Sequence, residues 1–137
     1  MEVTRLPAHL FAEAVSLWQE CGLTRPWNDP DEDLRRAMSG RDSTVLACQR
    51  ESELLATAMV GHDGHRGWVY YLAVREDERR HGLGRALMRS CEAWVVARGV
   101  PKLQLMVRTG NEPVILFYAR LGYEENDVVV LGRRLDS

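Results

Sequence analysis

The sequence lacks an excess of positive charge. Its 137 residues include 18 Lys and Arg against 20 Asp and Glu, a formal net charge of −2. A general nucleic-acid-binding protein is expected to be basic, so this balance argues against nucleic acid as a partner. No apolar run approaches the roughly 20 residues that a membrane helix needs, and the amino terminus does not resemble a signal peptide. We therefore expect no membrane partner either.

Cysteine is scarce and irregularly placed. The chain has three cysteines, Cys21, Cys48 and Cys91. Their odd number and wide spacing predict reduced thiols in a cytoplasmic protein rather than a disulfide framework, and no pair has metal-ligand spacing. His62, Asp63 and His65 are close in sequence, but they fall in a predicted hairpin turn with no fourth ligand. We expect no metal.

The length fits one domain, residues 1–137, and the 45% hydrophobic content is enough for one core. Hydrophobic periodicity predicts strands over 2–6, 43–49, 54–60, 68–74, 103–108 and 128–131, and helices over 7–22, 31–38, 83–99 and 111–122. Three meander strands followed by a β-α-β unit predict a mixed, mainly antiparallel sheet flanked by helices. The expected fold class is therefore an α/β (α+β) three-layer sandwich.

A glycine- and arginine-rich loop, Arg79-Arg80-His81-Gly82-Leu83-Gly84, joins the strand at 68–74 to the long helix. Glycine lets the backbone turn and approach a ligand closely, and the free amides and dipole of a helix N-terminus attract phosphate. Arg79, Arg80 and Arg85 add positive charge. Taken alone, two glycines are equally consistent with a plain helix start. The loop lacks the Gly-Lys-Ser/Thr of nucleotide triphosphate loops and the third glycine of a dinucleotide fingerprint.

Two motifs together resemble those of the GNAT N-acetyltransferases. Arg79-x-x-Gly82-x-Gly84, after a strand that ends in Val74, is similar to the family's acetyl-CoA signature. A helix opened by Asn111 and running through Tyr118 to Gly122-Tyr123 is similar to its second signature. The element order agrees as well, so the resemblance covers essentially the whole chain and implies the GNAT (acyl-CoA N-acyltransferase) fold. The loop at 23–30 also resembles that of small bacterial YpeA-type members, which implies a bacterial protein.

The resemblance implies an enzyme that transfers an acetyl group from acetyl-CoA to a primary amine of a small molecule, protein or peptide. It implies the following cofactor-binding residues: Leu72, Val74, Arg79, Arg80, Gly82, Gly84, Arg85, Asn111 and Tyr118. In the implied reaction, the amide of Leu72 stabilises the developing oxyanion and Tyr118 protonates the coenzyme A thiolate. From the residues alone, Tyr118 is also consistent with a core aromatic, and Asn111 with a helix cap.

The residues that bind the acceptor amine are less clearly indicated by the sequence than those that bind the cofactor. In this fold the loop between the first two helices usually covers the acceptor, and the loop here contains Arg25, Trp27, Asn28 and Asp29. An aspartate or an aromatic ring there would hold a cationic amine, but a solvated loop with Trp27 against the core is an equal alternative. Strand alternation places Tyr70 or its neighbour Tyr71 on the substrate side. No residue stands out as the general base.

Two other functions share these motifs. A non-catalytic acetyl-CoA sensor would keep the same phosphate loop, and a partner-binding module would have lost the cofactor. The expected edge strand at 128–131 would allow pairing with a second copy and hence a homodimer.

Overall fold

The computed structural model describes residues 2–136. The chain divides into two compact units, and the boundary in the sequence lies between Met106 and Val107. The strands of the first unit are β1 (Val3–Arg5), β2 (Ser43–Arg50), β3 (Glu53–His62), β4 (Gly67–Val74) and β5 (Leu103–Leu105). Its helices are α1 (Phe11–Glu20), α2 (Pro30–Ser39) and α3 (Leu83–Ala97), with short 3-10 turns at Ala8–Leu10 and Glu76–Glu78. The order of these elements agrees with the order predicted from the periodicity.

The five strands form one sheet in the order β1-β2-β3-β4-β5. Neighbours from β1 to β4 are antiparallel. This was expected for β2, β3 and β4, which are joined by short turns. Helix α3 is the crossover that makes β5 parallel to β4. The mixed, mainly antiparallel sheet is confirmed.

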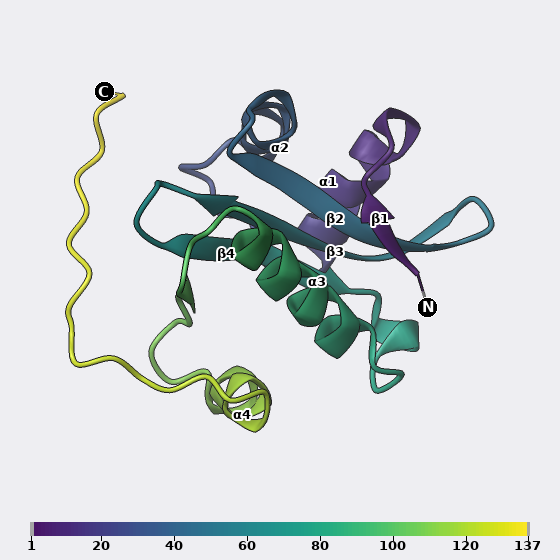
Figure 1. Cartoon of the computed structure of the whole chain (residues 1–137). Coiled ribbons are helices and arrows are strands. Elements are labelled where there is room, and N and C mark those ends of the chain that lie inside the picture. The colour runs from purple at the N-terminus through teal and green to yellow at the C-terminus, as the bar shows by residue number, and fades with distance from the viewer. Residues whose placement is uncertain (1, 137) are drawn as a thin grey trace. The chain divides into compact units, whose positions relative to one another are not determined.

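Helices cover both faces of this sheet, which confirms the three-layer arrangement (Figure 1). On one face α1 and α2 bury a cluster that includes Leu10, Trp18 and Leu34 against Val45 and Ala73 of the sheet. On the other face α3 contacts β2, β3 and β4. Its buried side chains recur at helical spacing: Leu83, Leu87, Met88, Cys91 and Val95.

The second unit contains α4 (Glu112–Arg120), which has Pro113 in its first turn. The predicted strand at 128–131 is wrong, because residues 128–136 have no regular secondary structure and Val129 and Leu131 are 84% and 90% exposed. A run of β-branched residues favours a strand only where the backbone pairs and one face is buried. The segment therefore offers no preformed edge strand for a second copy.

Over residues 2–136, no helix combines the length and the apolar character needed to cross a membrane.

Candidate functional site

The candidate site lies along the part of β4 that has a paired strand on one side only. Strand β5 pairs with β4 only from Gly67 to Val69, whereas β3 pairs with β4 as far as Val74. Among residues 2–136, no strand therefore pairs with this edge of β4 from Tyr70 to Val74. An unpaired strand edge carries N–H and C=O groups that can pair with another extended chain.

At Val74, the backbone N–H and C=O point toward this unpaired edge. Arg75 donates its backbone N–H to the carbonyl of Leu55 at 2.9 Å, which makes Ala56 and Val74 a non-hydrogen-bonded pair of the antiparallel ladder. The N–H and C=O of Val74 consequently face away from β3. Its carbonyl accepts from Arg79 Nε at 3.2 Å and from Cys21 Sγ at 3.6 Å.

A β-bulge interrupts β4 just before this edge. Thr57 pairs with Ala73 and Met59 with Tyr70, so Tyr71 and Leu72 together lie opposite one residue of β3. Tyr71 adopts a left-handed backbone with φ +54°, a conformation that costs a non-glycine residue about 1 kcal/mol. The bulge takes Leu72 out of the regular ladder, which sequence alternation did not predict.

A buried chain of hydrogen bonds holds the bulge in place. Trp18 Nε1 donates to Thr57 Oγ1 at 2.8 Å, and that hydroxyl donates to the carbonyl of Tyr71 at 3.2 Å. The Trp18 and Tyr71 rings stack with centroids 4.0 Å apart and an interplanar angle of 10°. Helix α1 and strand β3 thus fix both the main chain and the side chain of Tyr71.

Tyr70 and Tyr71, adjacent in β4, have different surroundings. Tyr71 packs against the core and donates its hydroxyl to Asp33 Oδ2 at 2.8 Å, and burial together with this carboxylate raises the pKa of Tyr71. Tyr70 is 44% exposed and stacks with Trp68. Of the two, Tyr70 is therefore the more accessible to a ligand, and its place in the acceptor site stays a prediction.

The loop after β4 turns sharply into α3. Arg80 and Gly82 both have left-handed backbones, with φ +70° and +82°, and Gly82 is the N-cap of α3. Open space lies over Gly82, because a Cβ there would meet nothing within 4 Å. The amides of the first turn, including those of Gly84 and Arg85, have no partners inside the helix. These features suit a bound anion.

Glu78 ties the start of this loop to the β2–β3 turn. Its carboxylate lies 2.5 Å from Arg50 Nη2 and 3.4 Å from His81 Nδ1. The hydrogen bond from Arg50, followed by the charges of Arg50 and His81, lowers the pKa of Glu78 despite its burial. An acidic residue beside a phosphate site would repel the ligand, but here its charge is offset by Arg50.

The loop between α1 and α2 is held mainly by its own backbone. Arg25 donates to the carbonyls of Gly22 and Thr24, each at 2.8 Å, and its own carbonyl accepts from the N–H of Asn28. Asp29 caps α2 by accepting from the N–H of Glu32 at 3.2 Å. Trp27 is 56% exposed, so the alternative in which its ring tucks against the core is wrong.

The second signature lies in the second compact unit. Asn111 occupies the N-cap position of α4, but its side chain makes no capping hydrogen bond. Tyr118 is buried and contacts Phe117 and Tyr123, with ring centroids 5.0 and 5.9 Å away. Burial and aromatic contacts are what a core aromatic shows, and they are also compatible with a catalytic hydroxyl.

The sequence profile of the acetyltransferase (GNAT) family matches residues 12–123, most of the chain. The chain belongs to the GNAT acetyltransferase family. The family is one of acetyl-CoA-dependent N-acetyltransferases, so the protein is an enzyme of this class. The narrower resemblance to YpeA-type members stays a prediction.

Solved structures share the fold of this acetyltransferase at low identity. AAC(6')-Iy, solved with the bisubstrate analogue CoA-S-monomethyl-acetylneamine, is 12% identical with a TM-score of 0.83, covering 98% of this chain and 97% of its own. The apo aminoglycoside 6'-N-acetyltransferase AAC(6')-IG of Acinetobacter haemolyticus is 15% identical, with a TM-score of 0.79 and coverage of 99% and 100%. The ribosomal-protein-S18-alanine N-acetyltransferase of Escherichia coli is 23% identical, with a TM-score of 0.75 and coverage of 91% and 78%.

We predict that Thr57→Val destabilises this acetyltransferase by about 2 kcal/mol, because valine leaves the buried Trp18 N–H and Tyr71 carbonyl without their partner. Urea unfolding followed by tryptophan fluorescence measures the change. Thr4→Val, the same substitution at an exposed position of β1, should change the free energy of unfolding by less than about 0.5 kcal/mol. Equal stability of the two variants would contradict the role given to Thr57.

Proposed function

We propose that this protein transfers an acetyl group from acetyl-CoA to a primary amine of a small molecule or of a protein or peptide. The observation that carries the proposal is the unpaired edge of β4 between Tyr70 and Val74, followed by the left-handed turn into α3. An extended arm ending in a pyrophosphate needs such a pair of features in succession. The open space over Gly82 leaves room for the phosphates.

The phosphate groups would be held by the amides of Arg80, Gly82, Gly84 and Arg85 at the start of α3. The N–H and C=O of Val74 would pair with the pantetheine arm as an additional strand does. That carbonyl already accepts from Arg79 and from Cys21, so pairing with the arm would replace the weak thiol donor of Cys21. Arg79 would therefore border the arm as well as add positive charge.

When bound, acetyl-CoA supplies the electrophilic thioester carbonyl. The N–H of Leu72, freed from the ladder register by the bulge, would donate to the carbonyl oxygen where negative charge develops. Tyr118 would donate its hydroxyl proton to the departing thiolate, and Asn111 would contact the cofactor. The roles of Tyr118 and Asn111 are supported by the motif that contains them.

For the acceptor, the exposed Tyr70 and Trp27 offer aromatic faces suited to a cationic amine. Asp29 is engaged as a helix cap and Arg25 in its own loop, so these two and Asn28 would shape the acceptor loop. The neighbours include aminoglycoside and protein-alanine acetyltransferases, and both amine classes are candidates here. A homodimer formed by edge pairing at 128–131 would require this segment to become a strand on association.

A non-catalytic acetyl-CoA sensor would have the same phosphate loop, so amine-dependent turnover is the property that distinguishes it from an enzyme. An enzyme and a sensor are distinguished by measuring release of the coenzyme A thiol. The assay uses a panel of primary amines that includes aminoglycosides and an alanine-ended peptide. A sensor binds acetyl-CoA and gives no amine-dependent release.

We predict that acetyl-CoA at about 100 times its dissociation constant stabilises the protein by about 2.7 kcal/mol, and that Gly82→Glu abolishes this gain by placing a carboxylate at the phosphate site. Thermal unfolding with and without acetyl-CoA measures the effect. Gly99→Glu is the matched control, because Gly99 also has a positive φ (+76°) and open space over its Cβ position, but it follows the other end of α3. Equal loss in both variants, or no gain in the native protein, would contradict the placement of the cofactor.

Tyr118→Phe should slow amine-dependent thiol release by about 100-fold, the lower range for loss of a general acid, while acetyl-CoA still raises the unfolding temperature as in the native protein. Tyr123→Phe removes a hydroxyl from the neighbouring ring and should leave turnover within a few-fold. Unchanged turnover in Tyr118→Phe would remove this residue from the mechanism.

A further inference from the structure

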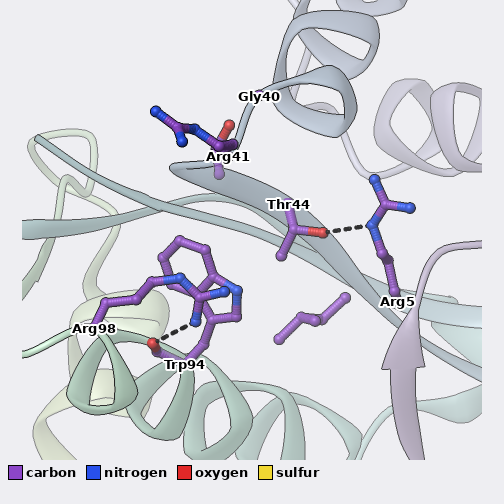
Figure 2. Close-up of a pocket in the computed structure, with 8 residues that line it drawn as sticks. Arg5, Gly40, Arg41, Thr44, Trp94 and Arg98 are labelled. Atoms are coloured by element: carbon purple, nitrogen blue, oxygen red, sulfur yellow. Dashed lines mark hydrogen bonds between the residues drawn. The ribbon is translucent and has the colours of Figure 1, made fainter.

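A second pocket lies on the α3 side of the sheet, at the end of that helix away from the phosphate loop. It has a volume of about 340 Å³ and is lined by Arg5, Arg41 and Arg98 together with Thr44 and Trp94. Figure 2 shows Arg5 and Arg98 on opposite sides of the pocket and Arg41 beside Gly40 at its rim. Its volume is in the range of small-molecule sites. Since α3 rises about 1.5 Å per residue, the pocket and the phosphate loop lie at opposite ends of a helix roughly 20 Å long.

Two of the arginines are held by neutral groups. Arg5 donates to Thr44 Oγ1 at 3.3 Å and to the carbonyl of Met38 at 2.6 Å. Arg98 donates to the carbonyl of Trp94 at 2.9 Å, and its guanidinium lies 3.6 Å from the centroid of the Trp94 ring. These contacts fix the side chains but do not neutralise them, and each guanidinium has five N–H donors of which only some are used.

Among the described residues, 2–136, no carboxylate side chain lines this pocket. In the part of the chain from 2 to 136, Arg5, Arg41 and Arg98 form no ion pair, whereas Arg35 and Arg50 elsewhere are matched by glutamates. Asp42 follows Arg41 in sequence, but its exposed carboxylate faces His62 at 3.5 Å. The chain as a whole carries a net charge of −2, so three uncompensated arginines around one hollow are a local concentration of positive charge.

We propose that this pocket binds a small organic polyanion, a molecule with two or more carboxylate or phosphate groups. Arginine matches both groups through paired N–H donors, and arginines on opposite sides suit a ligand with more than one anionic group. Thr44 adds a hydroxyl and Trp94 an apolar wall. The site is separate from the one proposed for acetyl-CoA and does not depend on it.

The test is titration calorimetry of the full chain at constant ionic strength, with citrate as the polycarboxylate and inorganic pyrophosphate as the polyphosphate. All proteins carry Gly82→Glu, so that the phosphate loop does not contribute. We expect saturable binding of at least one probe, and the stronger probe identifies the class of anionic group. Arg98→Ala should weaken its binding at least tenfold, the effect of losing one charge-assisted hydrogen bond.

Arg41→Ala, at the exposed rim, is a second variant that removes no contact of the core, so a folded protein is assured for at least one pocket variant. Arg35→Ala removes the same charge from an arginine already neutralised by Glu32 and should bind as the parent does. Circular dichroism verifies folding. Equal weakening in Arg35→Ala and Arg98→Ala, unchanged binding in both pocket variants, or no binding of either probe by the folded parent would overturn the proposal.

Discussion

Strand β4 has a partner on one side along its whole length and on the other side only at its beginning. Pairing with β5 ends at Val69, whereas pairing with β3 continues to Val74. The backbone groups beyond Val69 on the β5 side must therefore find partners outside the sheet, because buried N–H and C=O groups are rarely left unpaired. Arg79 and Cys21 approach Val74 at this edge, and the phosphate loop follows directly after it. The proposed cofactor site combines this unpaired edge with the loop that follows it.

The bulge at Tyr71 shows how the fold supports a strained position. A left-handed tyrosine is unfavourable on its own, yet here three elements hold it: Trp18 of α1 by stacking, Thr57 of β3 through the carbonyl, and Asp33 of α2 through the hydroxyl. Such convergence makes the bulge a fixed feature rather than a fluctuation. Leu72 is consequently presented at a defined place next to the unpaired edge, as preorganised stabilisation of a developing charge requires.

Sequence patterns predicted the elements that depend on local periodicity. The hydrophobic run at 68–74 and the apolar stripe of α3 predicted the right strand and helix. Glycine at 82 marked the helix start, because its φ of +82° favours that residue. The prediction of a strand at 128–131 was wrong, because β-propensity does not provide a pairing partner. The support of the bulge by Thr57 was not predictable in the same way. It depends on contacts between Trp18, Thr57 and Tyr71, which are far apart in sequence and carry no local signal.

We propose that the edge of β4 and the first turn of α3 together bind acetyl-CoA. Hydrogen–deuterium exchange of individual backbone amides, with and without saturating acetyl-CoA, is the most direct test. We expect slower exchange at Leu72 and Val74 and at the amides of 82–85, while amides of α2, on the face of the sheet away from α3, change little. Binding of acetyl-CoA with unchanged exchange at Val74 and at 82–85 would contradict it.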